Sequence, residues 1–176
     1  DPDAIRILTW NIHKQEDAGW AEDLTRFAAA NDVLLLQEVA LVDALQAVLR
    51  SAGLRFVMGS SFVYDDAEFG VLTATRVEPV AACTQRIEEP LLRIPKSAVI
   101  TWLPLAGTQH TLAVANVHSI NFSLSLATYE AQLAALADVL AQHEGPIVLG
   151  GDLNTWSQAR RDAVERTGVR LNLVEI

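Results

Sequence analysis

The feature that most constrains the fold of this chain is a series of short apolar runs that alternate with longer helical patterns. Residues 5–10 and 33–37 are strand-like runs, and the segment between them carries its large apolar side chains on one helical face. A second helix is predicted over 41–51, where Gly53 is a suitable C-terminal cap. Strands and helices in this order predict a layered sheet protein with helices on the outside.

The middle of the chain differs, because strand-like pieces follow one another there with only turn residues between them. The predicted strands of this region are 54–58, 70–74, 77–84, 98–103 and 111–117. The elements predicted after it are a helix from Ser123 that Gly145 ends, a strand over 146–150, a helix over 157–166 and an alternating strand over 169–174. No repeat or linker interrupts the pattern, so we predict a single domain over 1–176.

Composition limits the classes of partner and location that suit the chain. Hydrophobic residues make up 51% of the 176 residues, which predicts a packed core, and no apolar stretch is long enough to span a membrane. The net charge of −9 disfavours nucleic acid as a partner, since that binding relies on Lys and Arg. The nearest approach to a basic run is Arg160-Arg161, which we assign to a solvated helix face. Without a signal peptide, a cytoplasmic location is favoured.

Polar residues stand where four of the predicted strands end. They are Asn11 in TWNIHK, Glu38 in LLLQEV, His118 in ANVHSIN, and Asp152 with Asn154 in VLGGDLNTW. A strand end holds a side chain rigidly at the rim of a sheet, where many active sites are built. Carboxylate and amide oxygens suit a site that holds Mg²⁺ through one or two carboxylates, while phosphate and water complete the octahedron.

Each of these residues also has a purely structural interpretation. A single Glu or Asn at a strand end is commonly a cap or turn residue, and Asp152 and Asn154 are compatible with an Asx-turn. A single histidine such as His118 is more often structural than catalytic. The coincidence of four strand ends with matching chemistry favours the functional interpretation.

The elements TWN, LLQE, N-x-H and GGDLN, in this order, resemble the signature of the endonuclease/exonuclease/phosphatase superfamily, which includes DNase I-like nucleases, inositol polyphosphate phosphatases and sphingomyelinases. The stretches KSAVITWLPL and ANVHSINFSLSL are similar to an uncharacterised bacterial branch, the YafD-like proteins. The resemblance implies an α/β (α+β) fold, a four-layer α/β/β/α sandwich of two mostly antiparallel sheets with helices on the outer faces.

The same resemblance implies a metal-dependent hydrolase of phosphoester bonds and assigns a role to each matching residue. Glu38 would be the principal ligand of Mg²⁺ or Mn²⁺, with Asn11 beside it. Asp152 would take the proton from the attacking water, and Asn154 would position the phosphate or that aspartate. His118 would donate a hydrogen bond to a phosphate oxygen.

Three further positions receive weaker assignments. Asn121 matches a place where some members of the superfamily contact substrate phosphate. Arg93 and Lys96 carry charges that can reach a phosphate, but we interpret them as exposed charges on a strand.

The signature is incomplete at its end. The superfamily closes with an Asp-bearing strand and a terminal Ser-Asp-His, and no histidine follows Asn154 in this chain. The C-terminal part of the sandwich is therefore missing, and we expect the parent protein to continue for roughly 50–90 residues past Ile176.

Two functions remain open at this point. The first is the hydrolase, acting as a phosphodiesterase, nuclease or phosphatase on a phosphoester that the sequence does not identify. The alternative is a non-catalytic relative that binds a phosphate-bearing ligand or a protein partner. The sequence specifies neither the substrate nor the oligomeric state.

Overall fold

The computed structural model describes residues 4–90, 93–123 and 125–176. Its elements, in chain order, are β1 (Ile7–Asn11), a single 3-10 turn η1 (His13–Gln15), α1 (Trp20–Ala30), β2 (Val33–Ala40), α2 (Asp43–Ser51), β3 (Arg55–Tyr64), β4 (Ala67–Thr75), β5 (Ala81–Glu88), β6 (Pro95–Pro104), β7 (Thr111–His118), α3 (Ala127–Leu140), β8 (Ile147–Asp152) and α4 (Gln158–Arg170).

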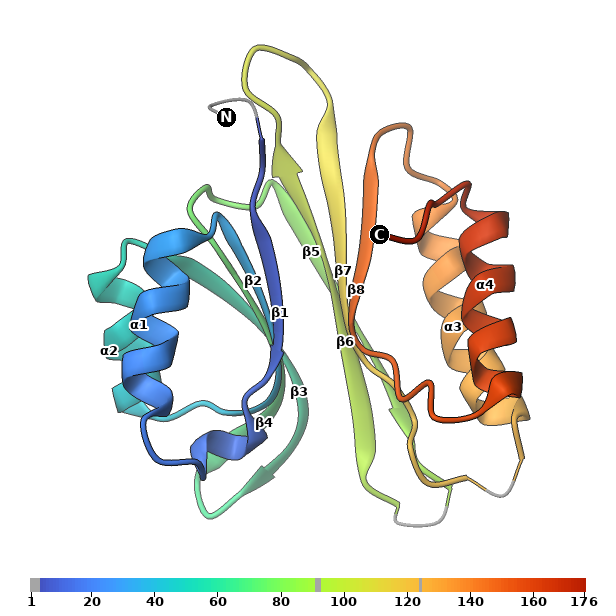
Figure 1. The fold of residues 1–176 in the computed structure, drawn as a ribbon, viewed down its shortest axis with the longest axis horizontal. Coiled ribbons are helices and arrows are strands. Elements are labelled where there is room, and N and C mark those ends of the chain that lie inside the picture. The colour runs from blue at the N-terminus through green and yellow to red at the C-terminus, as the bar shows by residue number, and fades with distance from the viewer. Residues whose placement is uncertain (1–3, 91–92, 124) are drawn as a thin grey trace.

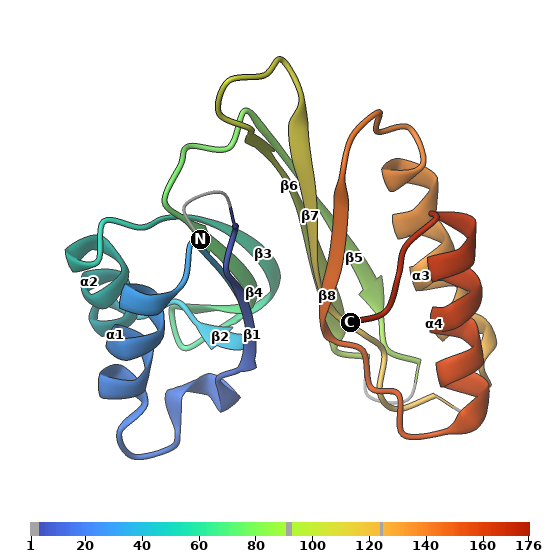
Figure 2. The same ribbon diagram turned by 45° about the horizontal axis from the view of Figure 1, so that its top comes forward.

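The strands form two sheets that pack between two pairs of helices (Figure 1). One sheet has the order β1-β2-β4-β3 and the other the order β5-β6-β7-β8. The pairs β1–β2 and β7–β8 are parallel, and the other pairs are antiparallel. Helices α1 and α2 cover the outer face of the first sheet and α3 and α4 that of the second, as Figure 2 also shows. The predicted α/β/β/α sandwich is confirmed.

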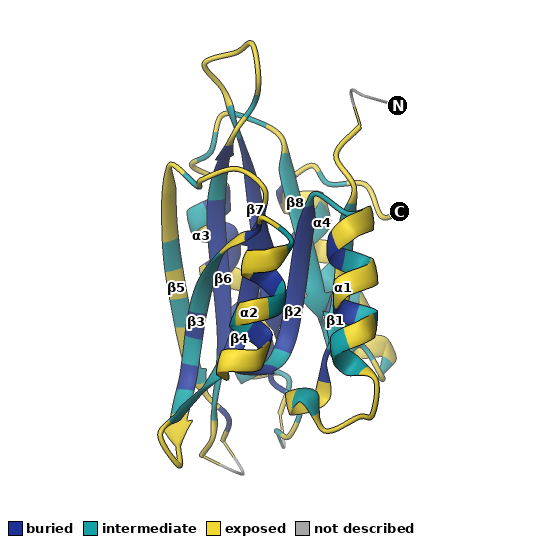
Figure 3. Ribbon diagram, turned by 90° about the vertical axis from the view of Figure 1, so that its left-hand side faces the viewer, coloured by how far each residue is buried: buried dark blue, intermediate teal, exposed yellow. Residues whose placement is uncertain are grey.

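Strand β2 lies between two hydrophobic cores, which explains its continuous apolar sequence. Leu34 and Leu36 pack beneath α1 and α2, whereas Val33 and Leu35 pack against the second sheet. Strands β2 and β7 are the most deeply buried, and β5 is exposed along much of its length (Figure 3). A strand with apolar neighbours on both faces loses the alternation of a half-exposed strand.

A buried polar contact joins the two sheets near the end of β2. The Nε2 atom of Gln37 donates to Oδ1 of Asn116 on β7 at 2.7 Å. In turn, Asn116 Nδ2 donates to the carbonyls of Leu36 and Leu72 at 3.2 and 3.0 Å. Both polar side chains are buried, so these hydrogen bonds fix how one sheet sits on the other.

The predicted strand over 169–174 is wrong, because α4 continues to Arg170 and then turns back. Asn172 adopts a left-handed φ of 53°, and its N–H donates to the Val169 carbonyl at 3.1 Å. Leu173 N–H donates to the Gly168 carbonyl at 2.8 Å, which completes a Schellman turn. The alternating pattern arises because Leu171 and Leu173 pack against the core between the second sheet and α3.

Other boundaries also differ from the prediction, and that of β3 differs most, since this strand continues to Tyr64 beyond its predicted end at 58. The strand expected over 77–84 begins at Ala81, since residues 76–80 are the connection that carries the chain from one sheet to the other. The helix expected from Ser123 begins at Ala127. Within the residues that the structure describes, no helix is long and apolar enough to cross a membrane.

Candidate active site

Four of the predicted site residues meet between the two sheets. Asn11 is the last residue of β1, His118 the last of β7 and Asp152 the last of β8, while Glu38 lies near the end of β2. Strands β1 and β2 belong to one sheet and β7 and β8 to the other. Because β1 contacts β8 across the sandwich, these strand ends face one another at one rim.

Asn11 links the two carboxylates of the site. Its Nδ2 atom donates to Glu38 Oε1 at 3.3 Å and to Asp152 Oδ2 at 3.0 Å. Its Oδ1 atom accepts the backbone N–H of His13 at 3.1 Å, which fixes the orientation of the amide. Carboxylates from two different sheets are thereby held on one amide group.

An irregularity in β2 turns Glu38 toward the site. The pairing with β4 shifts register between Leu36 and Val39, and Glu38 has a left-handed φ of 51°. A bulge of this kind turns one side chain out of the alternation of its strand. Glu38 Oε2 lies 4.0 Å from Lys14 Nζ, a half-exposed pair that contributes little to stability.

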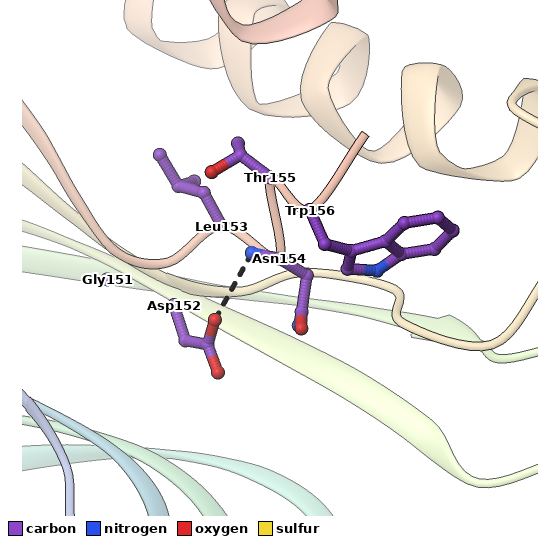
Figure 4. Close-up of a pocket in the computed structure, with 6 residues that line it drawn as sticks. All are labelled: Gly151, Asp152, Leu153, Asn154, Thr155 and Trp156. Atoms are coloured by element: carbon purple, nitrogen blue, oxygen red, sulfur yellow. Dashed lines mark hydrogen bonds between the residues drawn. The ribbon is translucent and has the colours of Figure 1, made fainter. Parts of the chain in front are cut away.

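The loop after β8 holds Asp152 from the other side. Asn154 N–H donates to Asp152 Oδ1 at 3.1 Å (Figure 4), and Asn154 Nδ2 donates to the Ser119 carbonyl at 3.0 Å. Ser119 N–H donates to the Asp152 carbonyl at 2.9 Å. Asn154 therefore positions the aspartate through its backbone and ties the loop to β7 through its side chain.

His118 is buried beside both carboxylates and a lysine. Its Nε2 atom lies 3.8 Å from Glu38 Oε1, 3.7 Å from Asp152 Oδ2 and 3.1 Å from Lys96 Nζ. Burial first and the Lys96 ammonium second lower the pKa of His118, against the opposing effect of the carboxylates. An ammonium only donates, so Nε2 accepts from Lys96 in this arrangement.

Lys96 is half-buried beside His118, so its interpretation as an exposed charge on a strand is wrong. Lys96 is the second residue of β6. Ala98 of this strand pairs with Val117 of β7, and this register brings the Lys96 side chain to His118. The one signal in the sequence was the antiparallel order, because the start of one strand lies at the same rim as the end of its neighbour. Arg93, interpreted in the same way, is indeed exposed.

Asn121 lies in the loop after β7, which a buried acid organises. Glu89 is 1% exposed, and its Oε1 accepts the backbone N–H groups of Asn121 and Phe122, each at 2.7 Å. The side-chain oxygen of Asn121 accepts the indole N–H of Trp156 at 3.0 Å. Glu89 gave no sequence signal, because its backbone partners are about thirty residues away.

Arg160 is buried, so its assignment to a solvated helix face is wrong. Its guanidinium donates to the carbonyls of Ile120, Asn121 and Asn154 at 2.6, 2.8 and 3.2 Å. Burial lowers the pKa of this guanidinium, which stays charged. Arg161, by contrast, is exposed as predicted. Arg160 thus connects the loops that carry Asn121 and Asn154.

The donors of the site suit a hard cation better than zinc. Glu38 and Asp152 offer carboxylate oxygens, and no set of three or more His, Cys, Asp and Glu in the described part of the chain has the arrangement of metal ligands. Mg²⁺ needs only one or two protein carboxylates, because water and phosphate supply its other ligands. Zn²⁺ sites use more nitrogen or sulfur ligands.

Comparison with known proteins gives the family of this chain. The family model described as "Endonuclease/Exonuclease/phosphatase family" matches residues 8–170. A UPF0294 protein of Vibrio parahaemolyticus is 38% identical over all 176 residues, and one of Klebsiella pneumoniae is 37% identical over 172 residues. The chain spans 62% and 64% of the length of these two bacterial relatives.

Solved structures show the same fold. An endonuclease/exonuclease/phosphatase family protein from Leptotrichia buccalis superposes with a TM-score of 0.66 at 17% identity, over 94% of this chain and 73% of that one. The 3′ phosphatase NExo from Neisseria, bound to a product DNA hairpin, gives a TM-score of 0.66 at 20% identity, over 95% and 71%.

Proposed function

The chain belongs to the endonuclease/exonuclease/phosphatase family, and we propose that it is a divalent-metal-dependent hydrolase of phosphoester bonds. The observation that carries the proposal is the meeting of Glu38 and Asp152 on the amide of Asn11, from two different sheets. Two carboxylates held close together repel each other, and a bound divalent cation would relieve that repulsion. Such repulsion is typical of a functional site.

Glu38 would hold the metal ion, Mg²⁺ or Mn²⁺. Asn11, predicted beside it as a ligand, turns its Nδ2 atom to both carboxylates and its Oδ1 atom to His13, so in this arrangement it would orient Glu38 for the metal. When bound, the ion supplies positive charge to the phosphate and makes a water molecule more acidic. Asp152 takes the proton from the attacking water, and the backbone N–H of Asn154 keeps its carboxylate oriented for that transfer.

His118 and Lys96 support the phosphate oxygens. The ammonium of Lys96 supplies charge to an oxygen that becomes more negative in the transition state. For His118 Nε2 to donate to the same phosphate, Lys96 must turn away from the imidazole, which its flexible stem allows. Asn121 would contact the phosphate through Nδ2, since its Oδ1 is engaged by Trp156.

The proposed partner is a phosphoester that is small enough to bind at the site without a basic surface around it. The net charge of −9 disfavours a long nucleic acid, and a bound metal ion provides the positive charge that such a surface would otherwise supply.

The direct test is hydrolysis of bis(p-nitrophenyl) phosphate and p-nitrophenyl phosphate by full-length protein with Mg²⁺ or Mn²⁺. We expect turnover that chelation abolishes, and a loss of about a hundredfold or more in Asp152→Asn. The control is the thermal unfolding midpoint, which should not fall in the variant. Binding of inorganic phosphate without any turnover would instead support the non-catalytic alternative.

Metal binding is tested separately by calorimetry with Mg²⁺ and Mn²⁺. Glu38→Gln removes the charge but keeps the size of the side chain, so we expect divalent-ion affinity to fall by at least about tenfold. Glu16→Gln, which changes an exposed acid outside the site, is the matched control. Unchanged affinity in Glu38→Gln would remove Glu38 from the set of metal ligands.

A further inference from the structure

Trp156 is an exposed aromatic residue at the edge of the proposed site. It follows Asn154 by two residues, and 65% of its surface is accessible. With Asp152, Asn154 and neighbouring residues it lines an open pocket of about 560 Å³ (Figure 4). A single exposed apolar side chain is ordinary on a protein surface, so its exposure alone assigns no role.

The indole ring is held in place although it is not buried. Its N–H donates to Asn121 Oδ1 at 3.0 Å, and the Arg160 guanidinium lies 4.5 Å from the ring centroid. Arg160 itself is 3% exposed and also lies 4.6 Å from the ring of Tyr129. A ring that is fixed before binding loses little conformational entropy when a ligand stacks on it.

The contacts of Trp156 leave one face of its ring free beside the residues proposed to bind phosphate. The guanidinium occupies one face of the ring, so the high exposure of the residue belongs to the other face and the outer edge. Arg160 also holds the Asn121 and Asn154 carbonyls, which fixes the ring relative to the loop that orients Asp152.

We propose that Trp156 is a specificity-determining residue that stacks on a planar ring attached to the phosphoester next to its phosphate. The proposal rests on the phosphoester hydrolase function, which supplies the phosphate anchor. A stacked ring next to an anchored phosphate selects nucleotide-like or aryl phosphoesters over aliphatic ones of equal charge, because every such ring offers a π-face.

The test compares the affinity of AMP with that of ribose 5-phosphate, which keeps the sugar phosphate and lacks the ring. Both are measured by calorimetry in Mg²⁺, with phenyl phosphate as a second planar ligand and phosphate release followed so that only intact ligand is counted. We expect AMP to bind roughly tenfold to a hundredfold more tightly than ribose 5-phosphate. Trp156→Leu should reduce this ratio by about tenfold, and Trp156→Phe should retain much of it.

Phe122→Leu is the matched control, because Phe122 is also exposed, at 53%, and follows Asn121 directly, whereas the aromatic rings that the Arg160 guanidinium stacks on in the described residues are Tyr129 and Trp156. Two results would overturn the role of Trp156 while phosphate binding stood. The first is equal affinity of the wild type for AMP and ribose 5-phosphate, and the second is a reduction of the affinity ratio in Phe122→Leu equal to that in Trp156→Leu. If neither sugar phosphate bound and no phosphoester were hydrolysed, the hydrolase function itself would fail, and this proposal with it.

Discussion

At the scale of single residues, the site depends on a small number of charges held at one rim. Lys96 is the ammonium closest to His118, and it lies among groups that carry negative charge. Removing it leaves the carboxylates and the imidazole in place but takes away a donor to the phosphate. Its contribution should therefore appear in catalysis more than in folding.

Lys96→Met is expected to reduce kcat/KM for bis(p-nitrophenyl) phosphate by about tenfold to a hundredfold, with most of the loss in kcat. Lys96→Arg should recover part of the rate, because it restores the charge with a different geometry. The matched control is Lys14→Met, whose ammonium lies 4.0 Å from Glu38 and is half-exposed. A rise in KM with unchanged kcat would show instead that Lys96 binds the substrate and the transition state equally.

Tyr129 gives a second prediction at this scale, concerning stability at high pH. Burial raises the pKa of Tyr129 to about 12, and its hydroxyl donates to the Leu153 carbonyl at 2.6 Å. The unfolded chain releases this proton near pH 10, whereas the folded chain keeps it, so the stabilising contribution is complete below pH 10 and is lost between pH 10 and 12. We expect the free energy of unfolding in urea to fall by up to about 3 kcal/mol over that interval.

Tyr129→Phe is the control for this effect, since it has no proton to release. The difference between wild type and Tyr129→Phe should therefore shrink as the pH rises through 10 to 12. A pH dependence identical in both proteins would show that Tyr129 does not titrate late in the folded state.

At the scale of elements, the parallel pair β7–β8 places His118 opposite Asp152. Gly151 makes this close pairing possible. Its φ is 130°, and a Cβ atom there would lie within van der Waals overlap of the Val117 carbonyl oxygen, at 2.1 Å. Both the backbone conformation and the close approach require glycine, so β8 cannot accept a side chain at the residue before Asp152.

Gly151→Ala is expected to lower the free energy of unfolding by about 2–4 kcal/mol and to reduce hydrolysis sharply, because the backbone must move before Asp152. Gly107→Ala separates the two causes. Gly107 also has a positive φ, 74°, but no atom lies within 4 Å of the position that a Cβ atom would take there. Gly107→Ala should lower the free energy of unfolding by only about 1–2 kcal/mol and leave activity intact. Equal costs at both positions would contradict a steric role for Val117.

At the scale of the whole molecule, the site exists only while the two sheets keep their relative position. Asn116 fixes that position, because it lies on β7 of one sheet and bonds to groups on β2 and β4 of the other. Replacing it leaves the Leu36 and Leu72 carbonyls and the Gln37 amide without this partner in the dry interior. Unsatisfied buried groups cost more than the hydrogen bonds gain.

Asn116→Ala should therefore lower the free energy of unfolding by about 3 kcal/mol, measured in urea. Gln109→Ala, at an exposed position, is the control and should change stability by less than about 0.5 kcal/mol. Activity should fall further than stability explains, because Asn11 and Glu38 lie on one sheet and His118 and Asp152 on the other. A change below about 1 kcal/mol would show that water or repacking replaces the Asn116 contacts.

The sequence by itself determined most of the strands and the polar residues that follow their apolar runs. Buried strands such as β2 and β7 are largely apolar, so Glu38 at the bulge of β2 and His118 at the end of β7 stand out in the sequence. The tertiary structure alone decided what meets at those ends. Lys96, Glu89 and Arg160 owe their places to partners far along the chain, and local periodicity contains no information about such contacts. The pattern over 169–174 was ambiguous for the same reason. Only the packing of Leu171 against the core between the second sheet and α3 distinguishes a helix end from a strand.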